Sequence, residues 1–352
     1  MKSKIICSVI GLFVAISFQT LGIRAAEVAQ TTTASQPVQP QDRNRLEGAP
    51  AAEPKIPVID GDYVLIYKPQ PDVYIGRDTK NYRKGATYKD WQPNDHSFIK
   101  GPDNRWHLFG ITRPNDVKSD GCHEGEELCF HAVAPVGTLE QAFRPQAWID
   151  QPKLGVSDCG WAPVVVKIGD TYSIIGSHMG RAESKDLYKW EDKGRLAAKG
   201  GNRDPNIMLW NGAYHLVRCD NAVVSLAIST DFVHWSEPQE IFKARQASWN
   251  CESPTLLHHE GTFYLFWCLY DSAGFGADDP ALYAGHNPAT YTYRTYVYAS
   301  ETPTDFHGRA PLAELKAHAP EIVQDEQGNW FISSADYPQR GVNLARLIWK
   351  QR

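Results

Sequence analysis

The sequence predicts an all-β protein built from five repeated units, the pattern of a five-bladed β-propeller. Its apolar runs are short, alternate with polar residues, and are separated at close intervals by Gly, Asp and Asn. Long stretches with a 3.6-residue apolar period are missing, and one strand–turn–strand pattern recurs five times. Because each propeller blade is a small sheet of consecutive hairpins, such a repeat predicts blades arranged around one axis.

Each repeat consists of an opening segment, a polar turn and an aromatic-rich strand. The openings are residues 94–99, 161–165, 203–207, 252–256 and 319–323, and the strands are residues 106–109, 172–175, 214–217, 263–266 and 330–333. From Ser97, or the matching Pro, to the first aromatic residue there are nine residues in the first four repeats and ten in the fifth. We therefore expect each pair to form the inner hairpin of one blade.

Two further segments share the pattern Ser-x-Asp-apolar-x-x-Trp, at residues 184–190 and 229–235. We expect each to be a turn near the outer strand of a blade, with its Trp packed between neighbouring blades. Asp186 and Asp231 are expected to cap these turns by accepting backbone N–H bonds. They are therefore not candidates for catalysis.

The N-terminal residues predict export. Lys2 and Lys4 precede the apolar run 5–18, which is too short for a comfortable bilayer span and is followed by small residues. We expect a signal peptide at residues 1–26, with a retained anchor as the alternative. Residues 27–56 are expected to be a flexible linker because they are rich in Ala, Thr, Gln and Pro, and residues 57–352 form the propeller domain. A secreted or periplasmic protein with no membrane span after signal cleavage follows from this reading.

The overall composition narrows the range of partners. The formal net charge is −5 and there is no basic run, which argues against nucleic acid or an anionic membrane as a partner. Eleven Trp and sixteen Tyr favour carbohydrate binding only weakly, because propeller strands also use aromatic residues for packing. Six cysteines follow the signal peptide, and Cys122 with Cys129 is the easiest local disulfide, with buried free thiols as the alternative. The sequence does not indicate an oligomeric state.

Three of the five openings begin with an acidic residue, namely Asp95, Asp204 and Glu252. They occupy nearly equivalent places in repeats one, three and four. Because the inner strands of a propeller begin near its axis, we expect these carboxyl groups to converge. Glycosidic bond cleavage needs one protonated carboxyl group and one ionised carboxylate across a sugar-sized gap. The alternative is that these acids only cap turns at the starts of strands.

The environment of each acid suggests its role. Glu252 has the longest side chain and lies next to Cys251, so we assign it as the general acid. Asp95 becomes the base or nucleophile, and Asp204, which Arg203 would hold ionised, sets the pKa and orients the substrate. The candidates for substrate binding are His96, Trp161, Arg203, Trp249, His178 and Arg181. Packing is the alternative role for the tryptophans.

These segments resemble the five-bladed propeller glycosidases of glycoside hydrolase family 43 and the related family 32. Residues 203–205 match the Arg-Asp-Pro block of the fructan-cleaving enzymes, residues 252–254 are similar to their Glu-Cys-Pro block, and residues 161–163 resemble the Trp-Ala-Pro of family 43. The resemblance implies a glycoside hydrolase for a furanoside or pentoside such as arabinan, xylan side chains or fructan, and the N-terminal signal predicts that it is secreted. We expect exo action, with endo action as the alternative. The resemblance implies no organic cofactor, and it allows a structural calcium ion beside His318, whose alternative role is that of a core histidine.

Two departures from the family pattern keep other functions open. The first acidic block reads Asn94-Asp95-His96-Ser97 where the family usually has Asn-Asp-Pro. The C-terminal β-sandwich usual in family 32 is also missing, which favours a branch like family 43. A non-catalytic glycan-binding propeller, or a glycoside phosphorylase or lyase-like enzyme on the same fold, remains the alternative.

Overall fold

The computed structural model describes residues 53–74, 78, 83–89, 91–114, 128–154, 162–200, 203–246, 248–271 and 291–352. Every described element belongs to the unit Pro50–Arg352. The predicted signal peptide and most of the predicted linker lie outside the described residues. Within the described part, no helix is long and apolar enough to span a membrane.

Five four-stranded antiparallel sheets make up the described part of the chain, and we number them as blades I to V. Blade I contains β4 (Trp91–Lys100), β5 (Trp106–Pro114), β6 (Leu128–Val133) and β7 (Ile149–Leu154); blade II contains β8 (Val164–Ile168), β9 (Thr171–Ile175), β10 (Gly180–Ser184) and β11 (Glu191–Arg195); blade III contains β12 (Arg203–Trp210), β13 (Ala213–Asp220), β14 (Val223–Ser229) and β15 (Gln239–Lys243); blade IV contains β16 (Trp249–His259), β17 (Thr262–Asp271), β18 (Tyr291–Ser300) and β19 (Ala313–Lys316); blade V contains β20 (Ile322–Gln324), β21 (Trp330–Ala335), β22 (Val342–Lys350) and β1 (Ile56–Tyr67).

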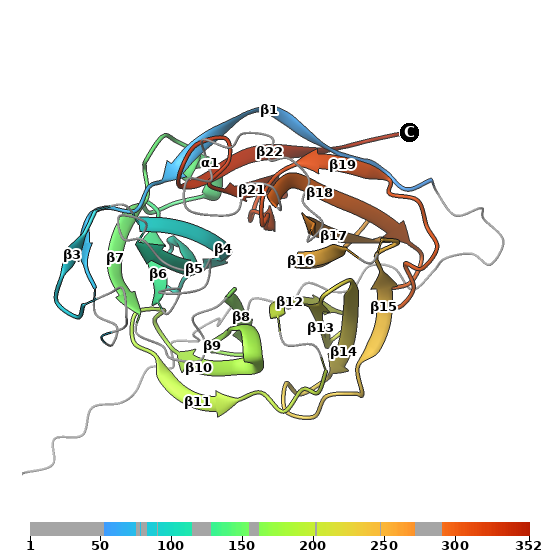
Figure 1. The fold of residues 1–352 in the computed structure, drawn as a ribbon, viewed down its shortest axis with the longest axis horizontal. Coiled ribbons are helices and arrows are strands. Elements are labelled where there is room, and N and C mark those ends of the chain that lie inside the picture. Colours follow the sequence, from blue (N-terminus) through green and yellow to red (C-terminus); the bar gives the residue numbers. More distant parts are fainter. Residues whose placement is uncertain are drawn as a thin grey trace, which may run out of the picture. The chain divides into compact units, whose positions relative to one another are not determined.

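The sheets follow one another around a central axis, with β4, β8, β12 and β16 innermost (Figure 1). The prediction of a five-bladed all-β propeller is therefore confirmed. A short hairpin of β2 (Asp72–Val73) and β3 (Thr87–Tyr88) lies outside the blades, and the described helical turns are α1 (Leu139–Ala142) and η1 (Ser177–Met179).

Strand β1 joins the two ends of the propeller. It pairs antiparallel with β22, from Ile56 opposite Lys350 to Tyr67 opposite Val342. The first strand of the propeller thus forms the outer edge of its last blade. This pairing covers the edge of β22 with chain from the other end of the domain and ties blade V to the segment that leads into blade I.

Each interface between neighbouring blades has its own hydrophobic core. Between blades I and II the rings of Phe109 and Trp190 lie 5.5 Å apart, edge to face. Buried apolar side chains also fill each of the other interfaces. The cluster between blades III and IV centres on Trp267, which is fully buried. These cores fix the inner strands relative to one another, which is what a site assembled from several blades requires.

The capping role predicted for the Ser-x-Asp segments is confirmed. Asp186 Oδ1 accepts the backbone N–H groups of Tyr188 and Lys189 at 2.9 and 2.8 Å. Asp231 Oδ1 accepts those of Val233 and His234, both at 2.8 Å. The backbone bonds lower the pKa of Asp186, and the ring of His234 together with the backbone bonds lowers that of Asp231. Neither residue lines the pocket at the propeller axis.

We expect Trp267→Ala to lower the free energy of unfolding by about 3–5 kcal/mol, since it leaves a cavity in the core between blades III and IV. The Trp267 ring lies 5.1 Å from the ring of Tyr296 and 5.5 Å from that of Phe242, so several partners lose contacts together. Chemical denaturation measures the change. Leu209→Ala is the control, because that side chain is 60% exposed and its loss should cost about 0.5 kcal/mol or less. A similar loss for both variants would contradict the prediction.

Candidate active site

A β-bulge near the start of the inner strand re-aims side chains in blades I, III and IV. In each case two residues of the inner strand lie opposite a single residue of the second strand. The bulged pairs are Asn94-Asp95 in β4, Asp204-Pro205 in β12 and Ser253-Pro254 in β16. Asp204 and Ser253 have φ values of 51° and 47°, in the left-handed region that non-glycine residues seldom adopt.

The three predicted acids do not occupy equivalent positions, which corrects the expectation from the repeat. Glu252 precedes the bulge of β16, Asp204 is the first bulged residue of β12, and Asp95 is the second bulged residue of β4. The spacing in the sequence was counted from the aromatic strand back across the turn to Ser97 or Pro. Because the hairpin of blade I has a longer turn than the others, the same count ends at a different position of its inner strand. The side chains nevertheless meet, because each bulge redirects the chain locally.

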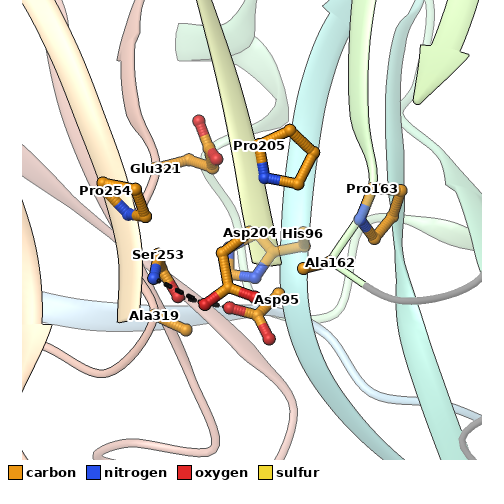
Figure 2. Close-up of a pocket in the computed structure, with 10 residues that line it drawn as sticks. All are labelled: Asp95, His96, Ala162, Pro163, Asp204, Pro205, Ser253, Pro254, Ala319 and Glu321. Carbon is orange, nitrogen blue, oxygen red and sulfur yellow. Dashed lines mark hydrogen bonds between the residues drawn. The ribbon is translucent and has the colours of Figure 1, made fainter. Parts of the chain in front are cut away.

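Hydrogen bonds connect the three acids into one cluster. Ser253 donates its hydroxyl hydrogen to Asp95 Oδ1 and its backbone N–H to Asp204 Oδ2, the latter at 3.1 Å (Figure 2). Arg203 Nη2 donates to Glu252 Oε1 at 2.6 Å and reaches Asp204 Oδ2 at 3.5 Å. Residues from blades I, III and IV, separated by as many as 158 positions, are thus linked directly.

Arg203 lies closer to Glu252 than to Asp204, so its main hydrogen bond differs from the one expected from the sequence. Asp204 is instead held from several sides. Its carboxylate accepts from Cys219 Sγ at 3.3 Å as well as from Ser253, and its backbone N–H donates to Ser177 Oγ in η1 at 3.2 Å. Only 7% of Asp204 is exposed. These contacts fix the carboxylate in one orientation.

The cluster holds more acidic groups than the one cation can neutralise. Burial raises the pKa of Asp95 well above its usual value, and the negative charges of Asp204 and Glu252 raise it further. The hydroxyl of Ser253 and the charge of Arg203 act in the opposite direction. The pKa of Arg203 is itself raised, chiefly by Asp204, so the guanidinium stays charged. The cluster therefore retains a proton under conditions where isolated carboxyl groups would be ionised.

A small pocket lies at the axis beside this cluster. Its lining includes Asp95, Asp204 and Ser253 together with Glu321, which comes from the start of blade V (Figure 2). Figure 2 shows the side chains of the first three grouped together and the Glu321 carboxyl lying apart from them. Glu321 is thus the third carboxyl group of the pocket lining, after Asp95 and Asp204, and Glu252 is not part of that lining.

Sequence reasoning missed Glu321 because it searched for an acid before the repeated Pro, whereas Glu321 follows Pro320. Burial, and then the negative charge of Asp95, raise the pKa of Glu321 to about 8. Its backbone N–H donates to Ser333 Oγ at 2.9 Å, which fixes the chain at this position. A search of every repeat opening for any acid, without a fixed offset, would have found it.

Glu321→Gln is expected to stabilise the protein selectively at alkaline pH. The folded-state pKa of about 8 exceeds the usual value of 4.5, so the stability linked to this group is complete below pH 4.5 and is lost as pH rises through 8. Glutamine removes that loss. The melting temperatures of variant and wild type should therefore be similar at pH 5, and the variant should melt higher at pH 9. An equal difference at both pH values would show that Glu321 does not titrate in this way.

The structure places His96 in the pocket lining but ties its ring to the protein. Nδ1 lies 3.0 Å from the carbonyl oxygen of Asn94, and Nε2 lies 2.7 Å from Ser333 Oγ. The side chain is buried, and burial lowers its pKa to about 4, so the imidazole is neutral near pH 7. These bonds join blade I to blade V. A substrate contact by His96 stays a prediction.

The other predicted substrate contacts are distributed unevenly. His178 is exposed in η1, next to the serine that binds Asp204. Arg181 lies in β10, the third strand of blade II, where it donates to Ser173 and Glu183 and its guanidinium lies 5.3 Å from the ring of Phe232. Its contacts are therefore with the body of the blades and with none of the three acids.

Of the two tryptophans predicted to contact substrate, the structure describes Trp249 and not Trp161. Trp249 begins β16 and stacks on Tyr296 at a centroid separation of 5.6 Å, packed against the core between blades III and IV. Trp161 lies outside the described residues, although the following Ala162 and Pro163 line the pocket. Stacking of either tryptophan on a sugar stays a prediction.

His318 and the cysteines were considered as a metal ligand and as disulfide partners. The buried His318 ring has Nδ1 3.1 Å from the carbonyl oxygen of Ala335, and burial lowers its pKa to about 4. Among the described residues there is no group of three or more His, Cys, Asp or Glu side chains suited to a metal ion. Cys219, Cys251 and Cys268 are buried free thiols. The predicted partner of Cys129, Cys122, lies outside the described residues.

Comparisons with known proteins give likenesses at low identity. No family model and no curated protein matches the chain. Among solved structures, it is similar to a Bacillus subtilis arabinanase, with 16% identity, 73% of this chain and 94% of the other covered, and a TM-score of 0.49. A Bombyx mori family 32 β-fructofuranosidase gives 16%, 73%, 58% and 0.48, and a Penicillium chrysogenum α-L-arabinanase complexed with arabinobiose gives 12%, 84%, 85% and 0.46. The chemistry has to be judged from the site.

Proposed function

We propose that the protein is an exported glycoside hydrolase that removes a terminal furanoside or pentoside from a glycan. The supporting observation is the single hydrogen-bonded cluster of Asp95, Asp204 and Glu252 beside a pocket at the propeller axis. A cluster of three carboxyl groups that retains a proton contains both an acid and a base, which are the two groups that glycosidic cleavage requires. Export is proposed from the sequence pattern of residues 1–26, and the sugar class from the sequence resemblance.

In the proposed reaction Glu252 protonates the oxygen of the leaving group, and Asp95 activates water or attacks the anomeric carbon. Asp204 supplies a negative charge that raises the pKa of Asp95 and favours the positive charge that develops on the sugar. Arg203 orients Glu252 through its bond to Oε1. The anomeric configuration of the first product, followed by NMR, distinguishes attack by water from attack by Asp95.

The proposal requires the shared proton to move when substrate binds. In the free protein Glu252 accepts a hydrogen bond from Arg203, whereas burial and two negative neighbours favour a protonated Asp95. A sugar hydroxyl that donates to Asp95 would stabilise its ionised form, and a glycosidic oxygen beside Glu252 would accept from its protonated form. Substrate thus favours the distribution that the reaction needs.

Purified mature protein should release a single sugar from one member of a panel of aryl arabinofuranosides, aryl xylosides, sucrose and oligosaccharides. Release that requires inorganic phosphate and yields a sugar 1-phosphate would identify a phosphorylase instead. Glycan binding measured by calorimetry without turnover on any substrate would identify a non-catalytic propeller. Both outcomes would overturn the proposed hydrolase.

A further inference from the structure

We infer that Ser253 is a positioning residue that holds the carboxylate of Asp95 against that of Asp204. This inference rests on the proposed function and adds a further polar residue to its machinery. Ser253 follows Glu252 in β16, so the strand that carries the proposed acid also supplies the hydrogen bond that organises the proposed base.

The geometry is specific to this residue. A single serine uses two donors on two carboxylates from different blades, its hydroxyl on Asp95 in blade I and its backbone N–H on Asp204 in blade III (Figure 2). Both bonds arise from a bulged residue with a φ of 47°. The connection therefore depends on the bulge and on the hydroxyl together.

The other blades show that the backbone does not require serine at this position. The residue before the repeated Pro has a positive φ in four blades, and it is Ala162 in blade II, Asp204 in blade III, Ser253 in blade IV and Ala319 in blade V. Since alanine has a positive φ at this position in two blades, the backbone conformation of Ser253 does not require its hydroxyl. Its contact with Asp95 gives it a role in the site.

The hydroxyl opposes the influences that keep Asp95 neutral. Charged and titratable groups act on Asp95 from several elements, namely Asp204 and Arg203 in β12, Glu252 in β16, Cys268 in β17 and Glu321 before β20. Burial and the acidic neighbours disfavour the carboxylate, while Ser253 and Arg203 favour it. An O–H donor bonded to a carboxylate stabilises the ionised form, so the loss of this donor raises the pKa of Asp95 further.

The test is the pH dependence of kcat/KM for Ser253→Gly. Glycine retains the backbone N–H that binds Asp204 and accepts a φ of 47° without strain, so the substitution removes little except the hydroxyl. We expect the acidic limb of the profile to move up by about one pH unit, which corresponds to about a tenfold loss on that limb. The loss should be smaller on the plateau at higher pH.

Two further variants separate the hydroxyl from effects on the backbone. Ser253→Ala removes the hydroxyl but keeps Cβ, and it should move the acidic limb as far as glycine does. Ser253→Thr restores a hydroxyl, so its limb should return toward that of wild type even though a β-branched residue at this φ lowers the melting temperature. An acidic limb unchanged in both the glycine and alanine variants would overturn the inference.

A stability measurement tests the inference even if the protein hydrolyses no glycoside. Because the pKa of Asp95 is raised in the folded state, ionisation of Asp95 costs stability as pH rises, and loss of the hydroxyl increases that cost. Ser253→Gly should therefore lower the melting temperature more at pH 8 than at pH 5, and this pH-dependent difference should vanish in an Asp95→Asn background. An equal change in melting temperature at both pH values would reject the positioning role of Ser253. It would leave the hydrolase proposal untouched.

Discussion

Glu252→Gln is expected to lower kcat by about 10²–10⁴-fold while leaving ligand binding close to that of wild type. The amide cannot donate a proton to a leaving oxygen, which is the role proposed for Glu252. Its carbonyl oxygen can still accept the hydrogen bond from Arg203, so the cluster should keep its geometry. Steady-state kinetics measures the loss, and calorimetry with the substrate or its product measures binding.

The leaving group distinguishes acid catalysis from a structural effect. Dinitrophenolate leaves the sugar with little help from a proton donor. The variant should therefore lose much less activity on a dinitrophenyl glycoside than on an alkyl glycoside or an oligosaccharide. Glu260→Gln is the matched control, because Glu260 lies in the β16–β17 turn, pairs with Lys55 and is remote from the central pocket. Near-wild-type turnover of oligosaccharides by Glu252→Gln would reject Glu252 as the general acid.

Asp95→Asn is expected to move activity and stability in opposite directions. Removal of the base or nucleophile should lower kcat by about 10²–10⁴-fold. The pKa of Asp95 is raised in the folded state, so the stability linked to the protonated carboxyl is lost as pH rises through that pKa. An amide does not ionise, so the variant should melt above wild type at pH 8, with a smaller difference at pH 5.

This pair of measurements also tests the simpler explanation that Asp95 only caps a turn. A capping carboxylate stabilises the fold through its ionised form, so its replacement would lower the melting temperature at pH 8. Asp231→Asn provides that comparison, because Asp231 accepts two backbone N–H bonds in a turn and has a lowered pKa. If both variants lose stability at pH 8, Asp95 is a capping residue rather than part of a catalytic cluster.

The repeats in the sequence were sufficient to predict the architecture. A nine-residue spacing from Pro to an aromatic residue encodes a hairpin, because both strand alternation and turn length are local properties of the chain. Five such hairpins cannot bury their aromatic faces alone, which requires a ring of stacked blades. The pairing of β1 with β22 did not follow from this pattern, since it joins chain segments almost 300 residues apart and has no local signal.

The sequence by itself determined the propeller fold and showed that three of its repeat openings begin with an acidic residue. Those acids indicated the class of chemistry that the site could perform. Tertiary structure alone decided how the side chains meet. The bulges place Asp95, Asp204 and Glu252 at three different offsets, turn Arg203 toward Glu252, and bring Ser253 against Asp95. The physical reason is that a bulge alters the direction of a side chain through one or two backbone angles, and Ala, Asp and Ser all adopt the same positive φ at this position, so residue type does not reveal it. Hydrogen bonds between blades depend on those directions, and so do the pKa values of the acids.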